Sequence, residues 1–289
     1  MSRLVARRNV RHFIRAGVPL AIAAMVGVTG VLAPLTARGE SPMNASTSRA
    51  AREEALQSIP FDKLPESHKT KISDVLDKVS IYRRLPVQVC HCDPQLYLFL
   101  MDHPEVLVNI WQAMGITGMS LHRTGPDAYK IDDGAGTQSD LEILYHDQNT
   151  HLVYAEGIYN GPVLKRPVKG RCVVLLKSGY SQKEDGAEFV THRIDAFVHL
   201  DRVGAELVAK TFQPLVGKSA DENFSEATAF LTRLSQAAEQ NQAGVQRLGQ
   251  YLTKIDPVLQ QQFIMLTASI ADKAVARTAS APDSSAQRR

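Results

Sequence analysis

The feature that most constrains the fold is the stretch from residue 119 to 201, where apolar and polar side chains alternate with a period of two. This alternation is typical of β-strands, because successive side chains point to opposite faces. Turn-forming residues interrupt it, as at Gly125-Pro126-Asp127 and at 147–150. Short turns join antiparallel neighbours, so we expect an antiparallel sheet with one covered face. The predicted strands are 119–122, 128–132, 141–145, 152–159, 172–177 and 190–200, and the apolar run 172–177 should be buried on both faces.

Helical patterns flank this stretch on both sides. Asp93-Pro94 predicts a helix start, because an Asp N-cap followed by proline is favoured there, and His103-Pro104 should end that helix and start another. A short strand pattern at 85–92 precedes the pair. Beyond residue 201 the pattern returns to that of amphipathic helices, and Ser219-x-x-Glu222 has the form of a capping box. The predicted helices are 50–57, 66–80, 93–103, 104–115, 204–212, 222–240, 245–255 and 258–274.

This order of elements predicts an α+β fold, with an antiparallel sheet, a long C-terminal helix and extra helices at both ends. No internal repeat is visible. The expected division is a signal peptide at 1–39, a leader and N-terminal helices at 40–81, an α+β domain at 82–241, a C-terminal helical extension at 242–276 and a disordered tail at 277–289.

Residues 1–39 have the pattern of a secretory signal peptide. Five arginines precede a nearly apolar segment at 16–35, and Ala37-Arg38-Gly39 suits signal peptidase. An uncleaved anchor is the alternative, because about 20 apolar residues span a bilayer, and it would associate the protein with the membrane. Either way we expect an exported protein, located in the periplasm or cell envelope.

The net charge of +3 depends on this first segment. Six of the 33 basic residues lie in 1–39, which has no acidic residue, so the remainder has 27 basic against 30 acidic groups. Binding to nucleic acid is dominated by Lys and Arg that neutralise phosphates, so we expect no nucleic-acid partner.

The stretch from Tyr82 to Gln240 resembles the START-like and polyketide-cyclase-like superfamily, which has the helix-grip fold. One strand, two successive helices, a meander of about six strands and a long closing helix follow in the order of that fold, and the passage from Asp195 to Asp201 looks like its last strand. The resemblance implies a curved sheet that grips the closing helix, with an apolar cavity between them for a lipid or another hydrophobic ligand.

Several side chains are candidates to line such a cavity. His192 falls on the apolar face of its strand, where it is either a hydrogen-bonded core histidine or a polar group that orients a ligand. Glu156 shares a face with Tyr154 and presents the same two alternatives. The basic stretch 165–171 is either a solvated loop or an anion-binding rim. The candidate ligand-binding residues are His192, Glu156, Tyr145, Tyr154, Arg166 and Lys169.

The sequence carries no recognised catalytic, haem or phosphate-binding motif, so we expect no cofactor and name no catalytic residue. The leading hypothesis is an exported protein that binds a hydrophobic or amphiphilic small molecule. One alternative is a cyclase-like or hydrolase-like enzyme on the same scaffold, in which His192 and Glu156 would act as base and acid in one pocket. The other is a structural envelope protein whose helices at 245–255 and 258–274 dock a protein partner that the sequence does not identify.

The expected pairing of the cysteines follows from the compartment and the resemblance. Exported chains tend to form disulfides, and the helix-grip order would place the strands of Cys90 and Cys172 close together, so these two form the candidate disulfide. Cys92 is an equally placed rival of Cys90, and buried thiols are the remaining alternative. No Cys-x-x-Cys pair is present, so we expect no metal site at the cysteines.

Overall fold

The computed structural model describes residues 44–161, 166–201, 204, 217 and 219–280. The expected signal peptide at 1–39, most of the helix expected at 204–212 and the last residues of the tail lie outside this range. Among the described helices, none is both long and apolar enough to cross a bilayer.

The described strands form one antiparallel sheet, and the α+β class is confirmed. Its order is β1-β8-β7-β6-β5-β4-β3, and β2 also pairs with β8. The meander predicted from the alternation is therefore present, and its last strand returns to pair with the first two. The strands are β1 (Ile81–Arg84), β2 (Gln88–His91), β3 (Ser120–Arg123), β4 (Ala128–Asp132), β5 (Thr137–His146), β6 (Thr150–Tyr159), β7 (Val168–Gln182) and β8 (Glu188–Leu200).

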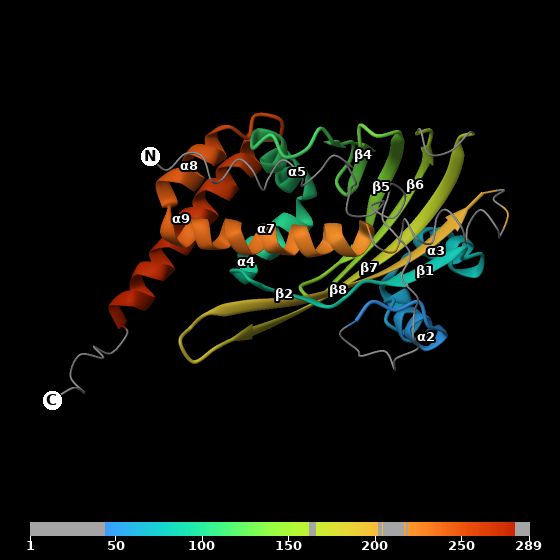
Figure 1. The fold of residues 1–289 in the computed structure, drawn as a ribbon, viewed down its shortest axis with the longest axis horizontal. Helices are drawn as coiled ribbons and strands as arrows, with labels where there is room; N and C mark the ends of the chain where they lie inside the picture. Colours follow the sequence, from blue (N-terminus) through green and yellow to red (C-terminus); the bar gives the residue numbers. More distant parts are fainter. Residues whose placement is uncertain (1–43, 162–165, 202–203, 205–216, 218, 281–289) are drawn as a thin grey trace, which may run out of the picture.

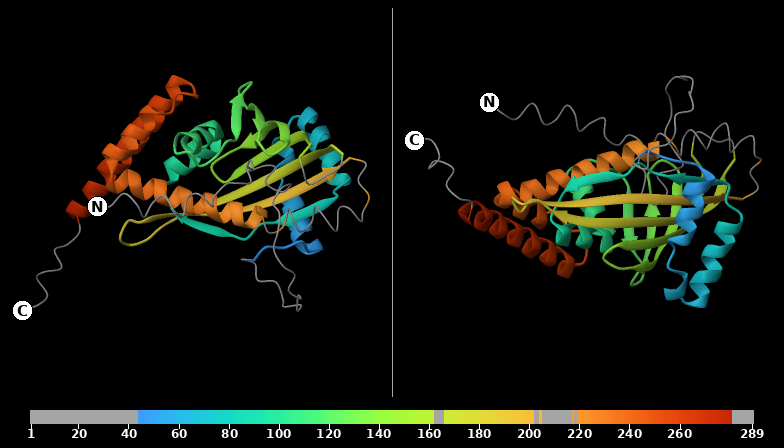
Figure 2. Two further views of the ribbon diagram at one scale, coloured as in Figure 1. Left: turned by 45° about the horizontal axis from the view of Figure 1, so that its top comes forward. Right: turned by 90° about the horizontal axis from the view of Figure 1, so that it is seen from below.

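Helix α7 (Ala220–Gln240) lies along one face of this sheet, which we call the inner face (Figures 1 and 2). Its Ala220 and Phe224 belong to a cluster of buried residues with Val174 of β7 and Ile194 of β8. Two shorter helices occupy the same side, α4 (Pro94–Asp102) and α5 (Pro104–Ala113). Asp93 caps α4 as predicted, since its carboxylate accepts from the backbone N–H groups of the first turn.

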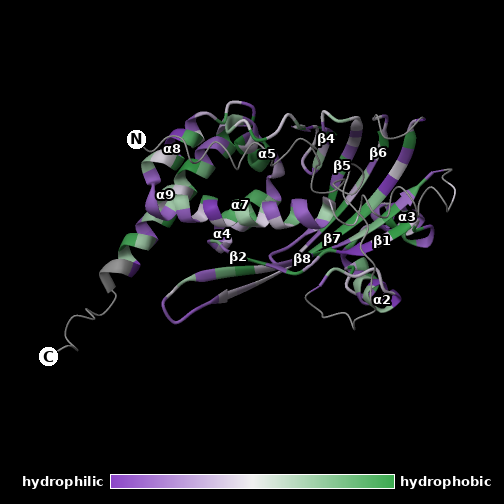
Figure 3. Cartoon of the chain, in the orientation of Figure 1, coloured by the Kyte–Doolittle hydropathy of each residue, from purple (hydrophilic) through white to green (hydrophobic). Residues whose placement is uncertain are grey.

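Part of the opposite, outer face is covered as well, which the expectation of one covered face did not include. Helices α2 (Arg49–Gln57) and α3 (Glu66–Asp77) pack on it, and a 3₁₀ turn, η1 (Phe61–Lys63), joins them. Their buried side chains cluster with Val173 and Leu175 of β7 and Phe197 of β8. The prediction that 172–177 is buried on both faces is confirmed, because Val173 and Val174 join the clusters on opposite faces. Figure 3 shows the alternation as hydrophobic and hydrophilic bands along the strands.

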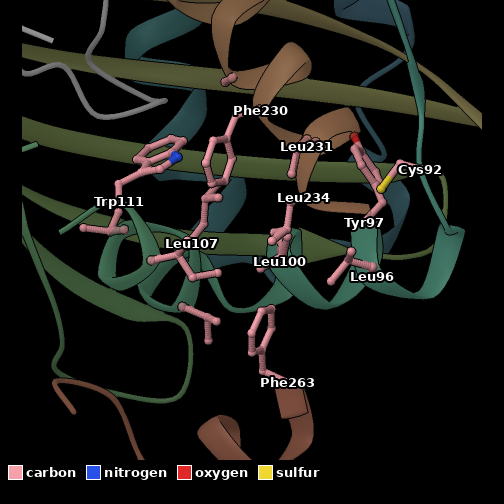
Figure 4. Packing of buried hydrophobic residues seen from close by; sticks show 14 of the residues in the cluster. Cys92, Leu96, Tyr97, Leu100, Leu107, Trp111, Phe230, Leu231, Leu234 and Phe263 are labelled. Atoms are coloured by element: carbon pink, nitrogen blue, oxygen red, sulfur yellow. The ribbon is translucent and has the colours of Figure 1, made fainter. Parts of the chain in front are cut away.

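The helices after α7 pack into the main core. Helices α8 (Gln242–Gln250) and α9 (Pro257–Ser280) contribute buried side chains to the cluster formed by α4, α5 and α7, which we call the helix-side core. Figure 4 shows Phe263 of α9 beside the helix that carries Leu96 and Leu100. The fully or nearly buried residues that α8, α9 and their connection supply are Val245, Leu252, Phe263 and Ile270.

Several boundaries differ from the prediction. The strand expected at 85–92 is shorter than predicted, since β2 covers only Gln88–His91, and β1 precedes it at Ile81–Arg84. The capping box expected at Ser219 is not observed, since the Ser219 side chain makes no capping hydrogen bond. Helix α8 ends at Gln250 rather than 255, and α9 continues to Ser280, so the helix enters the region expected to be a disordered tail.

Candidate functional site

A buried polar network lies between the sheet and the helices on its inner face, and His192 of β8 is at its centre. The Nδ1 atom of His192 is 3.2 Å from the Tyr97 hydroxyl of α4, and the Nε2 atom is 2.9 Å from Thr228 Oγ1 of α7. Ser178 Oγ of β7 is 2.8 Å from the same Tyr97 oxygen. All four side chains are buried. The network therefore links the sheet to both α4 and α7.

The hydrogen bonds determine which imidazole nitrogen carries the proton. Thr228 Oγ1 donates to the Phe224 carbonyl at 2.8 Å, so it must accept from His192 Nε2–H. Nδ1 is then the acceptor for the Tyr97 hydroxyl, which accepts in turn from Ser178. Both ring nitrogens have partners, and the Phe224 ring centroid is 4.7 Å from that of His192. The geometry matches the core alternative for His192, a neutral imidazole that holds helices to a sheet.

Burial lowers the pKa of His192 from 6.5 to about 4. In the unfolded chain this histidine binds a proton near pH 6.5, whereas the folded chain excludes the proton until about pH 4. Stability must therefore fall as the pH falls from 6.5 to 4, by about 3 kcal/mol for this group alone. We expect His192→Gln, which does not titrate, to be most destabilised relative to the original chain at pH 7 and least at pH 4. Urea unfolding at several pH values measures this difference, and parallel curves for the two chains would contradict it.

The other ligand-binding candidates do not lie in one site with His192. Register pairs Glu156 with Arg171 and Tyr145 with Leu152, all on the outer face, whereas His192 pairs with Ser178 on the inner face. Tyr154 donates to Glu156 on that outer face at 2.9 Å. Because the sheet separates His192 from Glu156, the pair cannot act as base and acid in one pocket. Lys169 and Arg166 are exposed side chains at the start of β7.

The outer face of β3 to β7 forms an open, charged hollow of about 920 Å³. Two of its basic side chains form ion pairs. Lys130 Nζ is 2.6 Å from Asp140 Oδ1, and Arg171 binds both Asp74 and Asp201. Its lining includes Ser120, His122, Lys130, Asp132, Gln138, Asp140, Glu156, Lys169, Arg171 and Asp201.

A second buried polar cluster, the Asp195 cluster, joins β8 to β1 and α2 on the outer face. The Asp195 side chain is fully buried and accepts from Tyr82 at 2.6 Å and from Arg84 Nε at 2.7 Å. Arg84 is itself buried and also donates to Glu54 and to the Ala51 carbonyl of α2. The Asp195 cluster was not foreseen, because its members are far apart in the sequence.

The expected Cys90–Cys172 disulfide is wrong: all three cysteines are buried thiols. Cys90 lies opposite Val190 on one side of β8, and Cys172 lies opposite Val198 on the other side. Eight residues of strand span about 26 Å, far beyond the ~7 Å between Cα atoms that a disulfide allows. Burial raises the pKa of the Cys172 thiol to about 12, which makes it a poor nucleophile.

Two polar atoms on the inner side were missed by the sequence reasoning. Among the residues that the structure describes, Trp111 Nε1 of α5 and Ser139 Oγ of β5 are buried without a hydrogen-bond partner. Trp111 packs in the helix-side core with Ile131 of β4, and its ring lies 5.9 Å from that of Phe230 in α7 (Figure 4). Ile131 is directly opposite Ser139 in the sheet. A buried tryptophan or serine that lacks a partner has no signature in a single sequence.

The fold defines the class of this protein: an antiparallel sheet with a long helix along its inner face, the helix-grip arrangement. No protein-family model and no curated protein sequence matches the chain. Solved structures with a similar fold include a conserved protein from Geobacillus kaustophilus, at 14% identity and a TM-score of 0.31, covering 49% of this chain and 93% of that one.

Two further solved structures are comparable. An uncharacterised protein from Rhizobium leguminosarum is 9% identical, with a TM-score of 0.30, over 50% of this chain and 95% of its own. The protein Ara h 8.0201 is 12% identical, with a TM-score of 0.28, over 50% of this chain and 99% of its own. At these scores the likeness adds nothing to a functional assignment, which must come from this chain's own residues.

Proposed function

We propose that the protein binds a hydrophobic or amphiphilic small molecule between the inner face of its sheet and helix α7, as members of the START-like superfamily would. The observation that carries the proposal is that two buried polar atoms without a hydrogen-bond partner, Trp111 Nε1 and Ser139 Oγ, lie in or beside the apolar helix-side core, Ser139 through its strand partner Ile131. Buried polar groups in folded proteins are nearly always hydrogen-bonded. Small-molecule sites combine an apolar lining with a few polar groups that fix orientation. A ligand with an apolar body and a polar group would supply the missing partners.

The chain contains a single tryptophan, Trp111, so its fluorescence reports directly on this layer. We expect oleate, added to the delipidated protein, to change the Trp111 emission saturably and to appear as a mass adduct in native mass spectrometry. The probe 1-anilinonaphthalene-8-sulfonate should compete with it. No saturable change and no adduct with either probe would contradict the proposal.

A pair of variants on one strand locates the site. Ser139→Ala removes an inner-face hydroxyl and should weaken binding of the probe about fivefold, since a hydrogen bond contributes about 1 kcal/mol. Gln138→Ala is the matched control, because Gln138 adjoins Ser139 in β5 but is exposed and donates to Asp132. Equal affinities in the two variants would place the probe elsewhere.

The site of action that we propose is outside the cytoplasm. The arginines and the apolar segment of residues 1–39 support this proposal. Intact mass and N-terminal sequencing of the protein recovered from an expressing cell distinguish cleavage after Gly39 from an uncleaved anchor.

A further inference from the structure

Three side chains with metal-binding atoms meet where helix α4 reaches the β5–β6 hairpin. Asp102 is the last residue of α4, His146 is the last residue of β5, and His151 is the second residue of β6. His146 and His151 are directly opposite each other in the register of the hairpin. Two of the three positions are therefore fixed by one pair of strands, and the third by the end of a helix.

The three ligand atoms converge on a small volume. Asp102 Oδ1 lies 3.0 Å from His146 Nδ1 and 2.9 Å from His151 Nε2. All three atoms lie within 4.8 Å of one another, and no other such group of His, Cys, Asp or Glu occurs among the described residues. An ion with bonds of about 2.0–2.2 Å to imidazole nitrogen and carboxylate oxygen needs its ligands about 3–3.5 Å apart. Small side-chain rotations from the observed positions provide that spacing.

The surroundings allow an ion to enter and to be held. His151 is 3% exposed and anchors the group from the core side, whereas Asp102 and His146 are 32% and 47% exposed. The neighbouring His103 faces away, since its Nδ1 lies 3.3 Å from Arg123, and Arg123 is paired with Glu105. The group thus carries one negative charge and two imidazoles that are neutral when they bind a metal.

The geometry points to a binding site for a divalent transition-metal ion at Asp102, His146 and His151. Two imidazoles and one carboxylate suit Zn²⁺, Fe²⁺ and related ions, whereas Mg²⁺ and Ca²⁺ prefer oxygen ligands alone. Three protein ligands leave at least one coordination position for water or another small ligand, as in catalytic rather than structural zinc sites. This site is independent of ligand binding at Trp111 and Ser139.

The test uses the full chain after treatment with EDTA and dialysis. Isothermal titration with ZnCl₂ should show one Zn²⁺ per chain, and MgCl₂ and CaCl₂ should give no comparable heat. Zn²⁺ should also raise the melting temperature, because a ligand that binds only the folded state stabilises it. Co²⁺ in place of Zn²⁺ should give visible absorption bands that report the nitrogen and oxygen ligands.

Two variants and one control decide the assignment. His146→Gln and Asp102→Asn should each weaken Zn²⁺ binding ~100-fold or more, since even partners of metal ligands account for 10–100-fold. The control is His122→Gln, which removes a histidine of the outer hollow and should leave the affinity unchanged. Circular dichroism establishes whether each variant is folded. His146 is more exposed than Asp102, so we expect His146→Gln to disturb the fold less. Absence of stoichiometric Zn²⁺ binding, or affinities that both variants leave unchanged, would overturn the site and leave a hydrogen-bonded triad that ties α4 to the hairpin.

Discussion

Asp195→Asn is expected to lower the free energy of unfolding by about 3–5 kcal/mol, because it leaves the buried guanidinium of Arg84 without its buried countercharge. Asp195 is fully buried, and its carboxylate accepts from both Tyr82 and Arg84. The amide that replaces it keeps the size of the side chain but removes the charge. Urea unfolding followed by circular dichroism measures the loss.

Asp140→Asn is the matched control. Asp140 also forms an ion pair on the outer face, at 2.6 Å from Lys130, but both side chains are at least 60% exposed. Exposed pairs contribute about 0–1 kcal/mol. Equal losses from the two substitutions would show that burial of the Asp195 cluster does not determine its energy.

Phe263→Ala is expected to cost about 3–5 kcal/mol, and truncation after Asn241 to abolish folding. Phe263 is fully buried against α4 and α7, and the truncation also removes Val245, Leu252 and Ile270 from the same core. Deleting a large buried side chain loses its transfer free energy and leaves a cavity. If these helices instead form an extension that docks a partner, the truncated chain will stay soluble and folded but lose a co-purifying partner.

Met265→Ala is the control for Phe263→Ala, because it tests whether the loss of stability depends on burial of the side chain within α9. Met265 is two residues from Phe263 and 62% exposed. Surface substitutions of this kind change stability by about 0.5 kcal/mol or less. Thermal unfolding of the two variants side by side should therefore separate them clearly.

Local patterns predicted the meander because each strand carries its own alternation. Strand β6 was expected at 152–159 and is observed at Thr150–Tyr159. Strand β1 was missed, since Arg83 and Arg84 interrupt any apolar pattern there. Arg84 can be buried because Asp195 of β8 and Glu54 of α2 pair with it. A charge that is neutralised by a distant residue cannot be recognised from its neighbours in the chain.

The candidate ligand residues show the limit of the period-two rule. Alternation placed Glu156 and Tyr154 on one face of β6, and their hydrogen bond agrees. It could not tell which face of β6 continues the face of His192 on β8, because that depends on the registers of the intervening strand. The cysteine prediction failed for the same reason: Cys90 and Cys172 both neighbour β8, but at opposite ends of it. Residues 102, 146 and 151 were brought together only by the tertiary packing of α4 on the hairpin.

During synthesis, β1 and β2 leave the ribosome well before β8, the strand with which they pair. Tyr82 and Asp195, which meet in the folded protein, are 113 residues apart. At ~5–20 residues per second, a ribosome needs roughly 6–20 s to synthesise that interval. Until β8 emerges, β1 and β2 have no strand to pair with, and the apolar faces of α2 and α3 lack their contact with Phe197. The nascent protein therefore exposes apolar surface for these seconds. Chaperones that hold unfolded chains would determine its yield at this stage.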